Sequence, residues 1–454
     1  MVTTQLAKRW LTVALLYIIF WYFCWNILEP DFGWHLVSGD YFRQHWVPLH
    51  DIFTYTAPGF AWIDHEWGSD VLTSVLYQLG GYALLTTVFA GIWTAAICLF
   101  RRRMSLGVLL AAQLAILPYM AVRPVAWTVL LMALLLELVQ RTYKSNWQPL
   151  VIFPLIFLLW ANLHAGFISG LAVLGYFCLI YRQKLWWSVL LLSAAVTLIN
   201  PYGLRLYIEI GRTMFDPALH AKVTEWSSFH LTPKTWPIIV IWAVAFGLFI
   251  RRRLSPQMGV AAIMLLASIS ATRNVPLFVV AALRDLDIFH QDFVKLPSRI
   301  QKLGRAAVIG FATIALTSVF IVFAVNHFRL TSAREARYPH QSVAYLQQHP
   351  CTGNVFNHYD FGGYLIWKLP GTKVYIDGRM PSWRDANGRA YMEHMSDIMS
   401  KPAAIRQEFA QYDIRCAVLT PGDEIAVDTL KADHWQQKTQ STQEILLVKP
   451  ASLR

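Results

Sequence analysis

One stretch of the chain, residues 29–70, gathers side chains that can act as bases, hold metal ions or bind a polar substrate. The whole chain has only 27 acidic residues and 14 histidines. This stretch alone contains Glu29, Asp31, His35, Asp40, His45, His50, Asp51, Asp64, His65, Glu66 and Asp70. Such a concentration predicts chemistry or binding here.

Glu29 and Asp31 stand out because only Pro30 separates them. The proline fixes the turn, so both carboxylates can face a common point. Such a pair can bind a divalent cation, Mg²⁺ or Mn²⁺, or one of the two can act as a general base. The alternative is that both are solvated acids of a loop.

The histidines of this stretch do not form a recognisable metal site. No spacing among these histidines and Glu66 matches a compact zinc motif. We instead interpret the run Asp64-His65-Glu66, together with His35, as side chains that bind a substrate.

Two arginines lie at turns between apolar segments, where basic residues are otherwise rare. Arg123 directly precedes a proline, and Arg273 lies shortly before another. At headgroup depth, a guanidinium in such a turn can bind a phosphate through two hydrogen bonds. The alternative is that both arginines anchor the chain to membrane lipids.

A third turn of this kind carries His164 beside Asn162. A structural, hydrogen-bonded role for His164 explains its position as well as substrate binding does. The pair Glu225-Trp226, in a predicted external segment, is a weaker candidate for a site.

The segments that carry these side chains are mostly apolar. Of 454 residues, 56% are hydrophobic and only 15% charged, which is more apolar surface than a soluble core needs. The composition predicts a polytopic α-helical membrane protein. The net charge of +12 does not indicate a nucleic-acid partner, because the basic residues cluster at the ends of apolar segments in the positive-inside pattern.

Apolar runs, polar breaks and basic clusters together predict about 11 membrane spans, with the N-terminus inside and the C-terminus outside. We expect an uncleaved first span, because no small-residue cleavage site follows it. Breaks at Gly80-Gly81 and at residues 162–166 divide the longer runs. The predicted apolar runs are 10–28, 71–100, 106–122, 125–140, 150–181, 185–199, a span that ends before Arg251, 258–283 and 306–328.

The character of the sequence changes at about Arg329. We therefore divide the chain into a transmembrane domain, residues 1–328, and a C-terminal extracytoplasmic α/β domain, residues 329–454. Predicted strands are 355–356, 364–367, 373–376, 416–419 and 445–448, and predicted helices include 342–348 and 403–412. Cys351 and Cys416 can pair only in an oxidising compartment, and the sequence leaves their pairing open.

An acidic pair in the first external loop, many spans and an external α/β tail together resemble the GT-C superfamily of polyprenyl-phosphate-dependent membrane glycosyltransferases. In the tail, residues 358–366 (HYDFGGYLI) are similar to the Trp-Trp-Asp-Tyr-Gly signature of oligosaccharyltransferase catalytic subunits, with His-Tyr in place of Trp-Trp and an extra glycine. Segments 160–164, 200–203 and 377–379 also resemble those of a broad group of bacterial membrane proteins.

The resemblance implies roles for several residues. Glu29 and Asp31 would carry the catalytic base or a metal ligand. Binding of the acceptor or another substrate would involve His35, Asp64, His65, Glu66, His164, Asp360, Tyr364, Asp377 and Arg379. The altered signature does not support recognition of an Asn-X-Ser/Thr peptide.

The function we expect is transfer of a sugar from a polyprenyl-phosphate donor to a lipid, glycan or protein acceptor, on the external face of a bacterial cytoplasmic (inner) membrane. Arg123 and Arg273 would bind the donor phosphate. A flippase for lipid-linked glycans is the alternative, although ionisable groups at the membrane midplane would be its signature. A non-catalytic GT-C-like scaffold is the third possibility.

Overall fold

The computed structural model describes residues 2–99, 106–229, 256–294 and 335–450. The chain divides into two compact units. The described parts of Met1–Ile27, Gly80–Leu204 and Thr224–Arg329 form the first unit, and those of Leu28–Leu79, Arg205–Val223 and Leu330–Arg454 form the second. Each unit is therefore assembled from segments that are far apart in the sequence.

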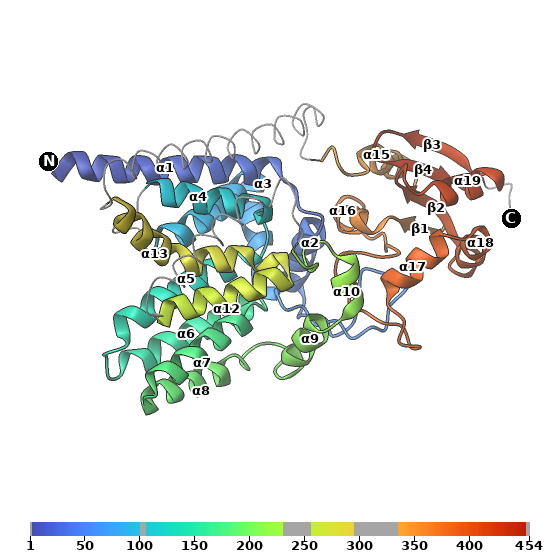
Figure 1. Cartoon of the computed structure of the whole chain (residues 1–454). Coiled ribbons are helices and arrows are strands. Elements are labelled where there is room, and N and C mark those ends of the chain that lie inside the picture. Colours follow the sequence, from blue (N-terminus) through green and yellow to red (C-terminus); the bar gives the residue numbers. More distant parts are fainter. Residues whose placement is uncertain (1, 100–105, 230–255, 295–334, 451–454) are drawn as a thin grey trace. The chain divides into compact units, whose positions relative to one another are not determined.

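The first unit is helical throughout its described residues (Figure 1). The closest packing joins α12 to α13, α6 to α8 and α4 to α13. The elements are α1 (Val2–Asn26), the second part of α3 (Trp67–Cys98), α4 (Leu106–Ile116), η2 (Leu117–Tyr119), α5 (Val125–Thr142), α6 (Gln148–Leu163), α7 (Phe167–Tyr181), α8 (Lys184–Val196), α12 (Pro256–Ser270), η3 (Thr272–Asn274) and α13 (Val275–Val294).

These helices are apolar on their outer faces as well as inside. Leu155, Leu179, Leu191 and Leu266 are each at least 60% exposed, which is typical of helices that face lipid. By length and composition, two described helices can cross a membrane, Trp67–Cys98 and Val125–Thr142, and several more are apolar but shorter. The predicted number of spans remains a prediction.

Polar or glycine-containing breaks separate the helices where the sequence predicted them. Helix α3 is interrupted at Gly80 and Gly81, and Gly81 has a φ of 62°, a conformation that a residue with a Cβ rarely adopts. The turn after α8 is held by Asn200, whose Oδ1 accepts the N–H groups of Tyr202 and Gly203 at 2.8 and 2.9 Å. The predicted spans that end before Arg251 and cover 306–328 lie mostly or wholly outside the described residues.

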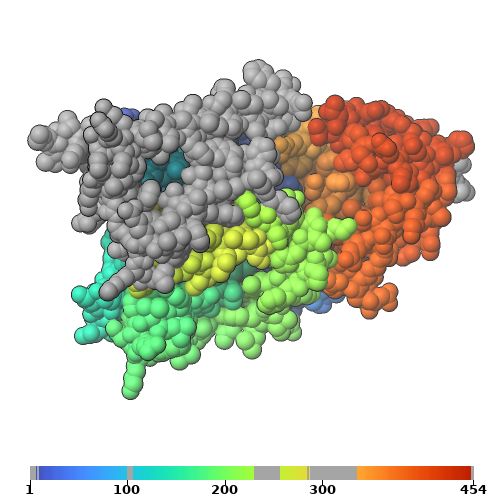
Figure 2. Space-filling view, viewed as in Figure 1, coloured from blue at the N-terminus to red at the C-terminus, as the bar shows by residue number. Residues whose placement is uncertain are grey.

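The second unit contains a four-stranded sheet in the order β1-β2-β4-β3. Strands β1 (Asn354–Asn357) and β2 (Ile414–Leu419) are parallel, and β4 (Ile445–Val448) runs antiparallel to both β2 and β3 (Gln436–Gln440). A disulfide joins Cys351 to Cys416 of β2. In the space-filling view, the orange-to-red residues of the described tail form one continuous body (Figure 2).

Helices surround this sheet and connect it to the earlier segments of the unit. They are α2 (Phe32–Gln44), the first part of α3, α9 (Arg205–Met214), α10 (Pro217–Lys222), α15 (His340–Gln348), η4 (Tyr359–Phe361), α16 (Gly362–Lys368), α17 (Tyr391–Met399), α18 (Pro402–Gln411) and α19 (Glu424–Ala432). One hydrophobic core includes Trp62 from the first loop with Phe356, Tyr375 and Trp383 from the tail.

Two of the five predicted strands are wrong. Residues 364–367 lie in helix α16, because a short apolar run has no clear period of its own. Residues 373–376 form only an isolated bridge, between Val374 and Thr54. Strand β3 was not predicted, because its glutamines are mostly exposed at the sheet edge.

Candidate functional site

Asp31 lies at the start of helix α2, in the second unit. Its backbone N–H donates to Oε2 of Glu29 at 2.9 Å, and the N–H of Phe32 donates to the Glu29 carbonyl at 3.1 Å. The sequence Glu29-Pro30-Asp31 therefore forms a tight turn into the helix. The Asp31 carboxylate makes no capping hydrogen bond to the first turn of α2, although the helix N-terminus favours its ionised form.

Glycines of the tail bring α16 and the following loop against this turn. A Cβ at Gly33 would lie 2.0 Å from the carbonyl oxygen of Gly363, and a Cβ at Gly363 would lie 2.4 Å from that of Pro30. Similarly, a Cβ at Gly378 would lie 1.6 Å from Oδ1 of Asp31. Residues 360–363 (DFGG) and 377–379 (DGR) therefore surround the turn at Asp31. Only glycine at positions 363 and 378 leaves the required space.

Tyr338 belongs to the same group of side chains. Its hydroxyl donates to the carbonyl of Leu28 at 2.9 Å, and its ring stacks on Tyr364 with 4.9 Å between centroids. Burial raises the Tyr338 pKa, and the Glu29, Asp31 and Asp360 carboxylates raise it further. The phenol is thus kept neutral, as a hydrogen-bond donor, near three acids.

Tyr364 and Asp360 have different surroundings. Tyr364 is only 3% exposed, and its hydroxyl donates to Glu335 Oε2 at 2.6 Å, so its ring is packed rather than presented to solvent. Asp360, the third residue of the segment 358–366, is exposed.

A buried polar network connects the starts of α2 and α3. His35 Nδ1 lies 2.7 Å from Asp70 Oδ1, and His35 Nε2 lies 3.4 Å from Glu66 Oε2. The N–H of Glu66 donates to Asp64 Oδ1 at 2.9 Å, and His65 Nε2 lies 3.5 Å from Glu66 Oε1. Sequence analysis named four of these five residues, and the structure brings all five together.

The electrostatics of this network follow from its burial. Burial raises the pKa of Asp64 to about 6, and the Glu66 charge adds to the rise. Burial alone would lower the His65 pKa, but Glu66, Asp64 and Glu209 hold it above its usual value. Burial, together with the Asp64 and Glu66 carboxylates, raises the pKa of Asp70 well above its usual value. The network therefore favours a proton on Asp70 and the charged form of His65.

Arg379 and Asp377 form a second buried group. The guanidinium of Arg379 binds both oxygens of Asp377, at 2.8 and 2.6 Å, and also lies 2.8 Å from Asp51 Oδ1. The rings of Phe53, Trp62 and Trp383 pack around it. Its side chain is only 2% exposed, so Arg379 joins the first loop to the tail through a compensated buried charge.

Among the residues that the structure describes, no three Asp, Glu, His or Cys side chains are arranged to hold a metal ion. Glu29 and Asp31 alone do not exclude one, because Mg²⁺ is commonly bound by one or two carboxylates with the remaining positions taken by water or substrate oxygens.

Arg123 and Arg273 lie in the first unit, and the structure brings them together on one carboxylate. Arg123 Nη1 lies 2.8 Å from Glu225 Oε2, and Arg273 Nη1 lies 3.6 Å from Glu225 Oε1. The side chains of Arg123, Arg273 and Glu225 are 22%, 21% and 29% exposed. Trp226 packs on the Arg273 guanidinium, 4.2 Å from the ring centroid. Two turns far apart in the sequence thus form one positively charged site.

His164, also in the first unit, is buried in a hydrogen-bonded turn. Its Nδ1 lies 2.7 Å from Thr128 Oγ1 and accepts the N–H of Gly166 at 2.9 Å, and Trp160 donates to the same threonine at 2.8 Å. These bonds connect α5 to the turn between α6 and α7.

No family model and no curated protein matches the sequence. Among solved structures, the oligosaccharyltransferase AglB from Archaeoglobus fulgidus, in complex with an inhibitory peptide and a dolichol-phosphate, matches with a TM-score of 0.57 and 11% identity over 98% of this chain and 75% of its own. ArnT from Cupriavidus metallidurans matches in the apo state and bound to undecaprenyl phosphate, with TM-scores of 0.52 and 0.53 and 14% identity, over 98% of this chain and 99% of ArnT. Both neighbours are GT-C glycosyltransferases. The chain shares the GT-C fold.

The resemblance of the sequence to GT-C proteins, and distantly to oligosaccharyltransferases, is thereby confirmed at the level of the fold. The roles of individual residues do not follow from a match of this kind. They rest on the geometry of this chain.

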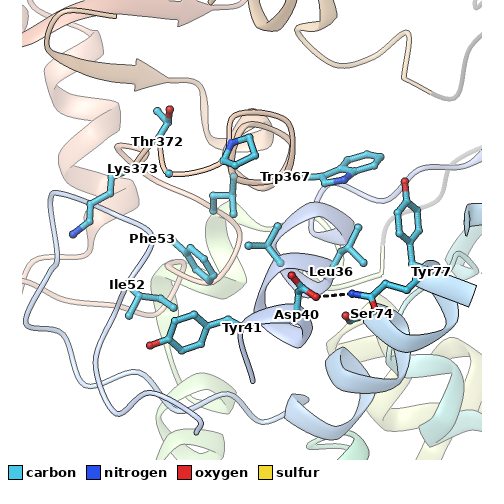
Figure 3. A pocket seen from close by; sticks show the side chains of 15 residues that line it. Leu36, Asp40, Tyr41, Ile52, Phe53, Ser74, Tyr77, Trp367, Thr372 and Lys373 are labelled. Atoms are coloured by element: carbon cyan, nitrogen blue, oxygen red, sulfur yellow. Dashed lines mark hydrogen bonds between the residues drawn. The ribbon is translucent and has the colours of Figure 1, made fainter. Parts of the chain in front are cut away.

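The second unit also contains a cavity of about 550 Å³, a volume typical of small-molecule sites. Figure 3 shows its walls, which come from α2, the first part of α3, the loop that carries Ile52 and Phe53, and α16 with the loop after it. Gln78 donates to Asp40 at 2.7 Å on one wall. The aromatic lining residues are Tyr41, Phe53, Tyr77 and Trp367.

Of these cavity residues, the sequence marked only Asp40, as one of the ionisable residues of the stretch 29–70. Four segments contribute to the walls, and each carries an ordinary pattern of aromatic and polar residues. Tyr338 was missed for a similar reason, because nothing in its local sequence marks it. The sequence marked the acidic pair and the two arginines as candidates because each is unusual where it stands, and their roles stay predictions.

Proposed function

We propose that the protein is an integral membrane glycosyltransferase that moves a sugar from a polyprenyl-phosphate donor to a lipid, glycan or protein acceptor on the external face of a bacterial inner membrane. The observation that carries the proposal is the convergence of Arg123 and Arg273 on one carboxylate, in a chain with the GT-C fold. Two guanidiniums that share one pair of oxygens suit a phosphate equally well.

In the proposed reaction, an acceptor hydroxyl attacks the anomeric carbon of the donor sugar. The bond from that carbon to the acceptor oxygen forms while its bond to the phosphate oxygen breaks. Polyprenyl phosphate leaves with the bonding electrons, and Asp31 takes the proton of the acceptor hydroxyl. Arg123 and Arg273 stabilise the negative charge that develops on the phosphate.

The surroundings of Asp31 support a role as base. Its carboxylate is partly exposed, and Gly378 leaves its Oδ1 room. We assign binding of the acceptor or other substrate groups to the exposed Asp360 and to the other residues named from the sequence: His35, Asp64, His65, Glu66, His164, Tyr364, Asp377 and Arg379. A Mg²⁺ or Mn²⁺ ion, if required, would be held by Glu29 and Asp31, where it would polarise substrate oxygens.

Donor binding tests the phosphate site. Arg273→Ala should weaken binding of undecaprenyl phosphate by about 1.5 to 3 kcal/mol, the range for hydrogen bonds to charged groups, with the lower end expected for a partly exposed arginine. Arg141→Ala is the matched control, because Arg141 also pairs with a glutamate, at 2.6 Å. Arg141 lies at the end of α5, whereas the proposed phosphate site includes Arg123, just before the start of α5. Equal phosphate binding by wild type and Arg273→Ala would leave only lipid anchoring for Arg273.

A further inference from the structure

Glu225 occupies the position that the proposed function assigns to the donor phosphate. One carboxylate oxygen pairs with Arg123 at 2.8 Å, and the other lies 3.6 Å from Arg273. Each of the three side chains is between a fifth and a third exposed, so an anion from solvent can reach the same donors. The carboxylate and an incoming phosphate therefore compete for the two guanidiniums.

Backbone hydrogen bonds fix Glu225 in this position. The N–H of Arg273 donates to the Glu225 carbonyl at 3.0 Å, and the N–H of Thr272 donates to the Ser227 carbonyl at 3.2 Å. The N–H of Phe229 donates to the carbonyl of Ile269 at 2.9 Å. The segment that carries Glu225 is thus paired along the turn that carries Arg273, unlike a surface ion pair between two mobile side chains.

The charges of donor and product give this competition a consequence. A sugar-linked polyprenyl phosphate is a phosphodiester with a single negative charge, whereas the released polyprenyl phosphate is a monoester with about −1.5 to −2 at neutral pH. Two arginines alone would therefore hold the product more tightly than the donor. An attached carboxylate lowers the affinity for both, because the site is open only for the fraction of time that Glu225 leaves it.

We propose that Glu225 is an internal competitor that returns to Arg123 and Arg273 and so allows the spent polyprenyl phosphate to leave. This inference rests on the proposed function, because it takes the two arginines as the phosphate site. It adds a role in product release for a residue that is neither the base nor a donor ligand.

The test measures binding of undecaprenyl phosphate in detergent to the full-length protein and to Glu225→Gln. The glutamine keeps the length and shape of the side chain but removes its charge, so the affinity should rise about 3- to 10-fold. Inhibition of sugar transfer by added undecaprenyl phosphate should become stronger by a similar factor. Glu137→Gln is the matched control, because it removes a glutamate that pairs with Arg141 at 2.6 Å, and its affinity should not change.

A second variant, Glu225→Asp, distinguishes an effect of the charge from misfolding of Glu225→Gln. Glu225→Asp keeps the charge but is one methylene shorter, so it cannot reach both arginines from the same backbone, and its affinity should lie between those of wild type and Glu225→Gln. Equal or weaker binding by both variants would overturn the inference. If Arg123→Ala and Arg273→Ala weaken phosphate binding while Glu225→Gln does not strengthen it, only this inference fails. If the arginine variants bind as wild type, the proposed phosphate site itself fails.

Discussion

Asp31 combines partial exposure with a position fixed by Glu29 on one side and Gly378 on the other. Asp31→Asn keeps the size of the side chain but removes its basicity. We expect the variant to insert, fold and bind undecaprenyl phosphate normally, and to lose about 10²- to 10⁴-fold in the rate of sugar transfer.

Asp428→Asn provides the control, since Asp428 is an exposed acid on α19 of the same unit. It should transfer sugar at the wild-type rate. A wild-type rate in Asp31→Asn would move the active site elsewhere, with the His65-Glu66 pair as the next candidate. Inhibition of the wild type by a chelator, reversed by Mg²⁺ or Mn²⁺, would assign Asp31 and Glu29 to a metal ion rather than to direct base catalysis.

Asp64 gives the second unit a measurable dependence on pH. Its pKa is raised from 3.8 to about 6 by burial, so the folded state binds the proton more tightly than the unfolded state does. The stabilisation is complete below about pH 4 and is lost as the pH rises through about 6, with a total on the order of 3 kcal/mol. Unfolding in detergent between pH 4.5 and 7.5 should show this loss. Asp64→Asn should flatten the curve, and an unchanged slope would contradict the assignment.

At the scale of single residues, the sequence indicated which polar residues gather, but not which side chains surround each of them. It named His35, Asp64, His65 and Glu66, and the structure joins them with Asp70. It could not show that Arg379 is enclosed by two acids and three aromatic rings, because those partners come from distant segments. Burial of a charged side chain is a property of the assembled unit.

Helices α2 and α16 approach each other through glycines. Gly363→Ala would place a methyl group only 2.4 Å from the Pro30 carbonyl oxygen, which is too close for either atom to remain in place. The helices must then separate, and we expect a loss of about 1 to 3 kcal/mol in the free energy of unfolding, together with a loss of activity as the turn at Asp31 moves.

Gly211→Ala is the matched control for this prediction. Gly211 lies in helix α9 of the same unit, and a Cβ there would meet no atom within 4 Å. Alanine should therefore leave stability unchanged or raise it by about 0.5 to 1 kcal/mol, because it favours the helix. Equal effects of the two substitutions on the unfolding midpoint would argue against close packing of α2 on α16.

The extra glycine of the predicted signature illustrates what could be read at the scale of elements. The sequence marked Gly363 as a departure from the signature and placed residues 364–367 in a strand. In the structure those residues form α16, and Gly363 is the point of closest approach to the first loop. Helix breaks with strong local chemistry, such as Gly80-Gly81 and residues 162–166, were predicted correctly because few residues decide them.

For the molecule as a whole, the location of the tail remains a prediction that topology can test. The Cys351–Cys416 disulfide is typical of an oxidising compartment. A reporter fused after Arg454 should be active outside the cytoplasm, and one fused at Arg103 should be active inside. Reporter activity inside the cytoplasm for the Arg454 fusion would contradict an external location of the tail.

The sequence indicated the GT-C fold class but could not predict how the units are composed. The division at about Arg329 follows a change in composition, whereas the second compact unit also includes Leu28–Leu79 and Arg205–Val223. Local patterns do not report which distant segments share a core. The shared core of Trp62 with Phe356, Tyr375 and Trp383 is visible only in three dimensions.

The composition of the second unit also bears on how the protein is made. The ribosome synthesises Asp31 and Gly33 long before Gly363 and Gly378, the two glycines that complete the surroundings of this turn. At about 5 to 20 residues per second, the nascent chain spends roughly tens of seconds with an acidic loop that has no tail to fold against. The site proposed at Asp31 can therefore form only after Gly378 has been synthesised, and a chain truncated before that residue should not transfer sugar.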